Sequence, residues 1–374
     1  MALALLAPLA SSAEEISSSP DMSSISISGF ASLIGGKTLG ACAPISDPVV
    51  AFSGPCTRFI ADYAHDGFYT PSLSLKPESH AGVQLTDRFN PVLSATVQVT
   101  SRDQRAEYAN LEWAYLSYKA TPELTIQAGR KRLPLYYYSD FQDIGYAYST
   151  IRPSADVYGW DVVNYNGASA SYSTDVADWS LRAEVLAGAE ASKDNAYSRL
   201  YYTNKQNLYW HEIVSGTLEF THDWLSGRVN YTHAHFTQSD QINGPMVLYN
   251  GRTDGGISLV GAALNADIGN VIVRSEMGVA NREVQGYTAR FFLVTVGYRI
   301  DQFTPTLGIS RYGEGTQVPQ FYSTNRDTTT TAAVRYDVMR NVDLKFQVDR
   351  LRDNAMPATI GSATLLSAAL DIVF

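Results

Sequence analysis

The chain has 374 residues, of which 45% are hydrophobic, and a formal net charge of −9. This acidic balance argues against a nucleic-acid partner, because phosphate binding requires a basic face. The mean hydropathy is only −0.13, and no run of about eighteen apolar residues occurs that would form a transmembrane helix. Barrel strands escape this test, because their apolar residues alternate with polar ones. A composition with 24 Tyr, 27 Gly and only 2 Cys favours β architecture.

The N-terminal ten residues read MALALLAPLA, and the small residues Ser11, Ser12 and Ala13 follow them. An apolar segment followed by small residues is typical of a secretory signal peptide. We therefore expect residues 1–13 to be a signal peptide and residues 14–374 to form the exported protein. An N-terminal strand is the alternative interpretation.

Cys42 and Cys56 lie in a segment rich in Gly, Pro and Ser. An export pathway permits disulfide formation, and a ring of about 15 residues would stabilise the protein by roughly 3 kcal/mol. The sequence therefore predicts a Cys42–Cys56 disulfide, with two free buried thiols as the alternative. We expect no metal site here, because neither cysteine has a CxxC partner or a nearby histidine, and we expect no cofactor.

Beyond residue 24 the chain alternates between apolar and polar residues. In the segment VDLKFQVD, residues 342–349, Val, Leu, Phe and Val alternate with Asp, Lys, Gln and Asp. A period of two places the two sets on opposite faces of a strand. The predicted strands are 24–34, 78–88, 91–101, 110–121, 124–133, 166–175, 178–189, 213–224, 225–238, 257–269, 271–284, 288–302, 303–315, 328–341, 342–354 and 362–374.

The connections between these strands alternate in length. Tight turns alternate with mostly longer stretches, which are 35–77, 102–109, 134–165, 190–212, 239–256, 285–287, 316–327 and 355–361. Short turns on one rim and long loops on the other are the arrangement of outer-membrane barrels. The sequence therefore predicts an all-β fold: a single transmembrane antiparallel β-barrel of about 16 strands, with short periplasmic turns and long extracellular loops.

Aromatic residues fall near both predicted rims. Trp179, Trp224 and Phe303 lie beside short turns, whereas Trp160 and Trp210 lie near strand ends on the long-loop side. Amphipathic rings at both rims form the aromatic girdle of a membrane barrel. We expect such a girdle, with core packing as the alternative for any single tryptophan.

The last strand ends Ala-Leu-Asp-Ile-Val-Phe, with Phe374 as the final residue. In these patterns the chain resembles the general trimeric porins of Gram-negative bacteria over nearly all of its mature length. The resemblance implies an outer-membrane location among lipid and lipopolysaccharide, a homotrimer, and recognition of Phe374 by the barrel-assembly machinery. It also implies that the third loop, residues 134–165, folds into the lumen as a constriction loop. This loop lacks the Pro-Glu-Phe-Gly-Gly type of sequence found in enteric porins.

If the apolar residues face lipid, the opposite strand faces carry too many charges for a packed core, where unpaired ions are costly. In a water-filled lumen such charges are solvated and set ion selectivity. The basic candidates for the pore wall are Lys131, Arg182, Arg228, Arg274, Arg299, Arg335 and Lys345. The acidic residues on the same faces are Glu184, Glu219, Glu276, Asp337, Asp343 and Asp371.

The third loop supplies carboxylates and aromatic rings. The candidate constriction residues there are Asp140, Asp143, Asp156, Tyr138 and Tyr146. Carboxylates facing a basic wall would create a transverse field, and we expect Arg299 and Arg335 to oppose Asp140 and Asp143. Local pairing that only rigidifies the barrel is the alternative. The tyrosines either line a sugar path or pack the loop against the wall.

Catalytic motifs are missing from the sequence, which has no GxSxG, GxGxxG or Walker-type glycine loop. His211 and Glu212 begin like a zincin motif, but residue 215 is serine, and we expect His233 and His235 to be solvated near the outer rim. The predicted function is therefore a non-enzymatic channel for passive diffusion of small hydrophilic solutes, since sixteen strands leave an aqueous passage. The alternatives are a channel specific for sugars, anions or amino acids, and a barrel whose surface loops act as an adhesin or receptor.

Overall fold

The computed structural model describes residues 24–39, 58–102, 109–202, 204–247, 251–283, 286–317, 324–355 and 361–374. The predicted signal peptide and both cysteines lie outside these ranges. Among the described residues no helix is long and apolar enough to cross a membrane.

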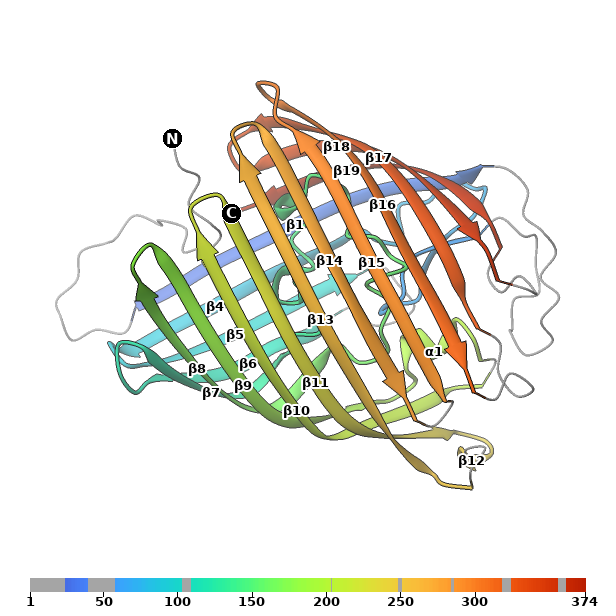
Figure 1. The fold of residues 1–374 in the computed structure, drawn as a ribbon, viewed down its shortest axis with the longest axis horizontal. Helices are drawn as coiled ribbons and strands as arrows, with labels where there is room; N and C mark the ends of the chain where they lie inside the picture. Colours follow the sequence, from blue (N-terminus) through green and yellow to red (C-terminus); the bar gives the residue numbers. More distant parts are fainter. Residues whose placement is uncertain are drawn as a thin grey trace.

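Sixteen long strands form one closed antiparallel barrel (Figure 1). They are β1 (Ser24–Leu39), β4 (His80–Asn90), β5 (Leu93–Arg102), β6 (Asn110–Lys119), β7 (Leu124–Arg132), β8 (Asn164–Val176), β9 (Trp179–Ser192), β10 (Gln206–His222), β11 (Leu225–Asp240), β13 (Asp254–Ile268), β14 (Val271–Arg282), β15 (Tyr287–Tyr298), β16 (Phe303–Thr316), β17 (Arg326–Met339), β18 (Val342–Asp353) and β19 (Ala363–Val373). The short elements of the loops are β2 (Phe59–Asp62), β3 (Gly67–Tyr69), β12 (Gly244–Pro245), the 3₁₀ helices η1 (Ser139–Phe141) and η2 (Gly145–Ala147), and the helical turn α1 (Ala196–Arg199).

The first strand closes the barrel. The N-terminal half of β1 pairs with β4, and its C-terminal half, from Phe30 to Leu39, pairs with β19. Closure leaves the sheet without free edges, and the predicted sixteen-stranded barrel is confirmed. The predicted start of β10 at residue 213 is too late, because a register shift between His211 and Val214 interrupts the alternation and hides the first part of the strand.

The tight turns gather at one rim, together with the start of β1 and the C-terminus (Figure 1). Five of these turns contain a residue with positive φ: Ala177, Asp223, Gly269, Asp301 and Asn341. Short hairpin turns require this conformation because it matches the twist of the paired strands. Gly, Asn and Asp adopt it most readily, which is why the turns were visible in the sequence.

The predicted aromatic girdle is confirmed for the short-turn rim, whereas the two tryptophans predicted for the long-loop rim lie inside the barrel. Trp179 and Trp224 are 37% and 45% exposed on the outside of the barrel. Trp160 and Trp210, by contrast, are 5% and 1% exposed and meet edge to face inside, with ring centroids 6.2 Å apart. The prediction is wrong for these two, because Trp210 falls on the inward face of β10 and Trp160 belongs to a loop that enters the barrel.

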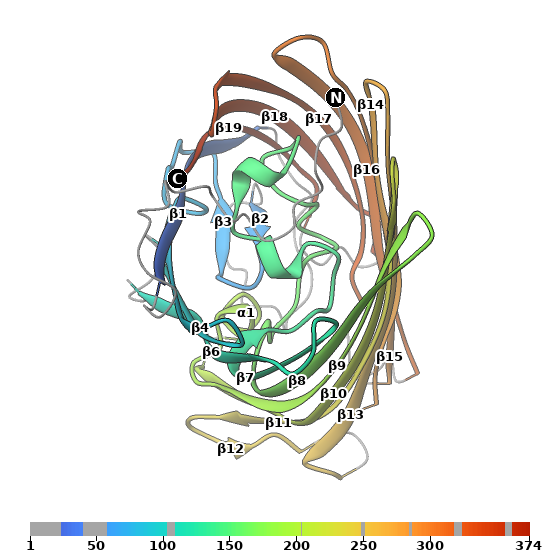
Figure 2. The same ribbon diagram turned by 90° about the vertical axis from the view of Figure 1, so that its left-hand side faces the viewer.

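Part of the first loop also lies inside the long-loop half of the barrel, as Figure 2 shows for β2 and β3. Phe59, Tyr63 and Tyr69 from this hairpin join one buried cluster with Leu200, which follows α1, and Leu365 of β19. Aromatic and aliphatic side chains of the first loop thus pack inside the barrel, whereas the sequence analysis had placed this loop outside it.

Phe374, the last residue of the chain, meets Gly29 of β1. Their backbones exchange hydrogen bonds of 2.9 and 3.0 Å, and the Phe374 ring covers Gly29 so closely that a Cβ there would lie 2.4 Å from Cζ. We expect Gly29→Ala to displace this ring and to lower the free energy of unfolding by about 1–3 kcal/mol. Urea titration of the folded barrel, followed by heat-modifiable gel migration, measures the loss.

Gly216 provides the matched control, because a Cβ there would meet no atom within 4 Å. Gly216→Ala should leave the urea midpoint unchanged or raise it slightly. In a Phe374→Ala background, Gly29→Ala should cost less than in the wild type. Equal losses in the two backgrounds would show that the ring does not cover Gly29.

Candidate constriction site

The third loop, residues 133–163, joins β7 to β8 and crosses the lumen (Figure 2). Its backbone is held by inward side chains from distant strands. Arg228 of β11 donates hydrogen bonds to the carbonyl oxygens of Pro134 (3.2 Å) and Tyr136 (3.1 Å). Lys345 of β18 donates to the carbonyl oxygen of Gly145 at 2.6 Å. These contacts place loop 3 inside the barrel, where the sequence resemblance had put it.

Asp143 is the centre of the first anchor of this loop. Its carboxylate accepts hydrogen bonds from both Arg102 of β5 and Arg132 of β7. Arg132 also pairs with Glu112 of β6 at 3.1 Å, and His80 Nε2 lies 2.6 Å from the Asp143 carbonyl oxygen. Burial alone would raise the pKa of Asp143, but the guanidinium groups of Arg102 and Arg132 outweigh burial and hold this pKa well below its usual range.

A second anchor lies beneath η2. Arg335 of β17 donates to the carbonyl oxygens of Tyr146 (2.6 Å) and Tyr148 (3.0 Å), and its guanidinium lies 4.4 Å from the centre of the Tyr146 ring. Arg335 also pairs with Asp343 at 3.1 Å. Fully buried Lys345 pairs with Asp343 at 3.4 Å as well as with the loop. Two predicted wall cations, Arg335 and Lys345, therefore bind the loop instead of lining open water.

The last part of the loop has its own contacts. Arg152 pairs with Glu78 and, at 2.8 Å, with Asp349 of β18. Asp156 accepts a hydrogen bond from Ser310 of β16 at 2.8 Å. Burial is the main influence on Asp156 and raises its pKa above the usual value. Together with the Arg228 contacts, loop 3 is thus fixed at four separate places around the barrel.

The loop tyrosines pack against one another and against the wall. Tyr136 lies 4.5 Å from Tyr158 and 5.5 Å from Phe291 of β15, measured between ring centres. Tyr138 is 4.9 Å from Tyr148. The Tyr138 ring is thereby packed among other aromatic residues of the loop, against the buried cluster that includes Tyr158 and Phe291.

Some charged side chains of the wall and of loop 3 remain accessible to water. Arg182 of β9 has a 37% exposed side chain, bonds to Glu184, and pairs with Glu219 of β10 at 3.1 Å. Lys131 of β7 donates to Gln127 at 2.5 Å. Asp140 of η1 is exposed and interacts electrostatically with Arg182. The accessible charges of this region are therefore Asp140 on the loop, and Arg182 together with partly exposed Glu219 on the wall.

The predicted opposition of Arg299 and Arg335 to Asp140 and Asp143 is wrong. Arg299 comes directly after β15 at the short-turn rim, 3.6 Å from Asp267, and Arg274 pairs with the same carboxylate at 2.9 Å. Depth in the barrel depends on distance from the turn, and Arg299 is too close to the turn to reach loop 3.

Two residues of the first anchor, Arg102 and Arg132, were missed in the sequence. Arg102 continues the inward alternation of Gln98 and Thr100 in β5, which was a usable signal. Arg132 follows inward-facing Lys131 directly, so alternation alone gave no indication that both residues turn toward the interior.

The three histidines His211, His233 and His235 gather on the outside of β10 and β11, with ring centres 5.3 to 5.7 Å apart. No group of three or more His, Cys, Asp or Glu in the described part of the chain is placed to hold a metal ion.

A closed antiparallel barrel with exposed apolar residues outside, charges inside and an inner loop across the lumen is the architecture of an outer-membrane channel. The sequence profile described as "Gram-negative porin" matches residues 1–355. The chain belongs to the Gram-negative porin family and forms an outer-membrane channel for passive diffusion of solutes. No curated protein matches the chain.

Solved structures share this fold at low sequence identity. The outer-membrane channel DcaP of Acinetobacter baumannii has a TM-score of 0.62 and 11% identity, covering 94% of this chain and 97% of DcaP. An anion-selective porin of Comamonas acidovorans has a TM-score of 0.57 and 12% identity, with 94% and 100% covered. The trimer form of OmpT, an outer-membrane protein of Vibrio cholerae, has a TM-score of 0.56 and 11% identity, with 95% and 100% covered.

Proposed function

We propose that the narrowest part of the solute path lies between Asp140 of loop 3 and the wall that carries Arg182 and Lys131. The supporting observation is exposure: Arg335, Lys345 and Asp143 are engaged with loop backbone or with buried partners, whereas Asp140 and Arg182 are accessible to water. Solvated charges on two sides of an aqueous passage act on passing ions, and buried pairs act mainly on the position of the loop.

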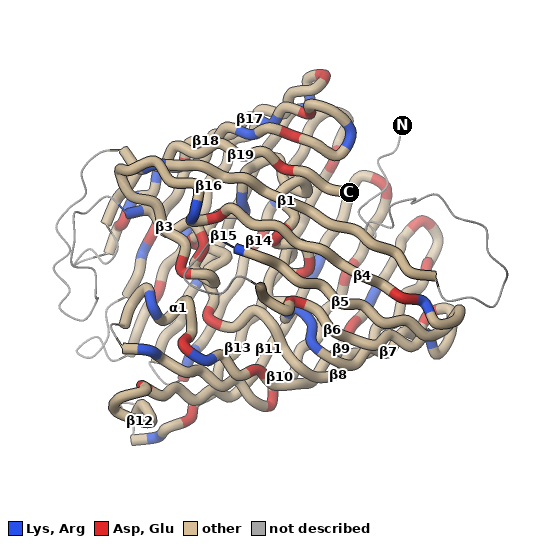
Figure 3. Tube along the Cα trace, turned by 180° about the vertical axis from the view of Figure 1, so that it is seen from behind, with Lys and Arg blue, Asp and Glu red and all other residues tan. Residues whose placement is uncertain are grey.

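The channel discriminates weakly between cations and anions in this proposal. Acidic and basic residues are interspersed over the barrel and do not separate into an acidic and a basic half (Figure 3). At the proposed passage, Arg182 and Lys131 are accompanied by Glu184 and Glu219 on the same wall. Mixed charge admits small hydrophilic solutes of either sign, and passage requires no catalytic step.

We also propose how the protein oligomerises and is assembled into the outer membrane. The protein forms a homotrimer, a state that the trimer form of the Vibrio cholerae relative supports. Exposed Phe374 and the apolar outer face of β19 serve as the recognition signal for the barrel-assembly machinery. The apolar outside of the barrel contacts lipid and, in the outer leaflet, lipopolysaccharide.

Planar-bilayer recording tests the proposal. Purified protein should produce stepwise conductance increases, with reversal potentials of only small magnitude in a tenfold salt gradient. Ion currents of one sign only, or folded protein that inserts without conductance steps, would contradict an open, weakly selective channel.

A further inference from the structure

The outer face of the neighbouring strands β15 to β18 (Figure 1) carries a group of exposed arginines. They are Arg290 of β15, Arg311 of β16, Arg326 of β17, and Arg350 and Arg352 of β18, here called the arginine patch. Their neighbours in sequence point inward, since Ala289, Phe291 and Ser310 are buried inside the barrel. Each arginine lies in the half of its strand that is nearer the long loops. The patch is therefore on the outside of the barrel, toward the rim opposite the tight turns.

The strand register brings these side chains together. Arg290 and Arg326 occupy one row across the sheet, with Gly313 between them. Arg311 and Arg352 occupy the next row, on either side of β17. Beyond its two chain neighbours, a Cβ at Gly313 would have Arg326 Cγ at 4.0 Å as its nearest contact, so the space between Arg290 and Arg326 is open. Neighbouring strands are about 4.8 Å apart, so the three spacings from β15 to β18 make the patch about 14 Å wide.

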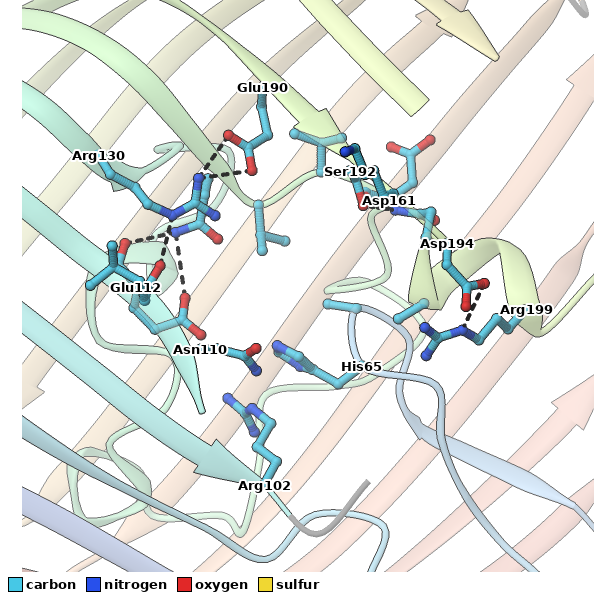
Figure 4. A pocket seen from close by; sticks show the side chains of 18 residues that line it. His65, Arg102, Asn110, Glu112, Arg130, Asp161, Glu190, Ser192, Asp194 and Arg199 are labelled. Carbon is cyan, nitrogen blue, oxygen red and sulfur yellow. Dashed lines mark hydrogen bonds and ion pairs between the residues drawn. The ribbon is translucent and has the colours of Figure 1, made fainter. Parts of the chain in front are cut away.

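No carboxylate on the outer face of these four strands balances the patch. Their acidic residues all occupy inward-facing positions, and these are Glu314, Asp327, Asp337, Asp343, Asp349 and Asp353. None of the five guanidinium groups forms an ion pair with a carboxylate of the described residues. Arg130 of β7, at the polar pocket in Figure 4, by contrast pairs with Glu190 at 2.8 Å. The patch thus presents concentrated positive charge that nothing described in the chain neutralises.

The outer face below the patch, toward the tight turns, is apolar. Phe292, Ile309 and Val348 are 38%, 46% and 42% exposed there. An arginine on the lipid-facing surface is costly at the middle of a bilayer but is tolerated near the interface. The patch therefore lies at the level of the lipid headgroups, and the apolar residues below it lie among the acyl chains. Because the long loops are extracellular, these headgroups belong to the outer leaflet.

We propose that the arginine patch binds the phosphate groups of lipopolysaccharide. Guanidinium groups bind phosphate oxygens in a bidentate manner, and clustered basic residues at a membrane surface attract anionic lipids. A patch four strands wide has room for two phosphate groups side by side. The favoured ligand is therefore lipid A, the lipid part of lipopolysaccharide, which carries two phosphates, and not a phospholipid with a single phosphodiester. The inference deepens the proposed function, in which lipopolysaccharide surrounds the barrel, and it rests on that contact.

Native mass spectrometry of the full-length protein in detergent tests the proposal, because it counts bound lipids and protein copies in one measurement. The probes are diphosphoryl lipid A, monophosphoryl lipid A and phosphatidylglycerol. We expect diphosphoryl lipid A to bind at least about tenfold more tightly than either of the other two lipids, since each of them lacks a charge-assisted phosphate contact.

Paired double variants locate the site. Arg311→Gln with Arg326→Gln should weaken the binding of diphosphoryl lipid A at least about tenfold. Arg88→Gln with Arg340→Gln is the matched control, because it changes the net charge equally at two exposed positions of the short-turn rim. The control should bind the lipid as the wild type does. Heat-modifiable gel migration verifies that both proteins are folded.

A second pair of variants keeps all five arginines. Gly313→Glu places a carboxylate between Arg290 and Arg326 and should weaken binding at least about tenfold. Gly313→Gln inserts a neutral side chain of the same size and should retain most of the binding. Open space above Gly313 lets the fold accept either side chain.

Equal binding of the three lipids, wild-type binding by the Arg311→Gln, Arg326→Gln protein, or equal loss in both double variants would each overturn the proposal. Loss of the oligomer in that protein, with lipid binding unchanged, would assign the patch to a contact between copies and overturn it as well. Bilayer recordings distinguish these results from failure of the channel function. Conductance without lipid A binding removes the lipid site and leaves the channel standing, whereas a wild type without conductance removes the channel function itself.

Discussion

Replacing Asp143 with alanine is expected to release loop 3 from the wall and to raise the single-channel conductance. The substitution leaves Arg102 and Arg132 buried without their shared carboxylate. Removing one partner of a buried ion pair costs about 3–5 kcal/mol, and the barrel strands themselves need not unfold to relieve that cost, because the loop can leave. Conductance in planar bilayers measures the widened lumen, and chymotryptic cleavage after Phe141 or Tyr148 reports the exposed loop.

Asp140→Ala is the matched control, since it removes an exposed carboxylate from the same loop. It should leave the loop as resistant to chymotrypsin as in the wild type. If Asp143→Ala protein were folded, resistant to chymotrypsin and unchanged in conductance, the carboxylate would not hold the loop.

Acid should not reproduce the effect of this substitution. The pKa of Asp143 is lowered in the folded protein. Its contribution to the stability of the docked loop is therefore fully present above the unfolded pKa of about 3.9, and it is lost only as the pH falls through the depressed folded pKa. Asp156, whose pKa is raised, binds its proton more readily in the folded state, so its contribution favours docking as the pH falls. We therefore expect conductance to stay constant from neutral pH to about pH 4.5.

Neutralising Asp140 and Arg182 should change ion selectivity in opposite directions. Asp140→Asn removes a negative charge from the loop side of the proposed passage and should raise the preference for anions. Arg182→Gln removes a positive charge from the wall and should raise the preference for cations. At separations of several ångströms in a hydrated passage one charge contributes about 0.5–1 kcal/mol, so each permeability ratio should change about two- to fivefold.

Reversal potentials in a salt gradient measure both changes, and Arg299→Gln at the short-turn rim should have a smaller effect. The shifts should weaken at high salt, because the Debye length falls from about 10 Å at 0.1 M to about 3 Å at 1 M. Unchanged reversal potentials in Asp140→Asn and Arg182→Gln proteins, with the barrel folded, would place the selective passage elsewhere.

The barrel was predictable because its determinants are local. Alternation assigns a face to each residue within a strand, and turn residues such as Asp223 and Asn341 reveal where strands reverse. Arg335 was assigned to the inward face on this basis, and it does contact loop 3 from within. The period of two and the turn residues therefore predicted both where the strands lie and which face of the barrel wall each side chain occupies.

Partners across the lumen were not predictable by the same means. Which cation meets Asp143 depends on where loop 3 enters the barrel and how deep each strand lies, and both depend on contacts between residues far apart in the sequence. Trp210 illustrates a second difficulty, since an aromatic residue near a strand end suits a membrane girdle and an inner cluster equally well. Only the register shift in β10 decides that it points inward.

The anchors of loop 3 also determine the order of events during folding. Lys345 lies 200 residues beyond Gly145 in the chain, and Ser367 lies 215 residues beyond Arg152. Contacts between residues so far apart form slowly, and these depend on β18 and β19, which are completed last in the chain. The loop contacts with β18 and β19 are therefore completed only when the barrel seam closes, whereas the Asp143 anchor needs only β5 and β7 and can form earlier.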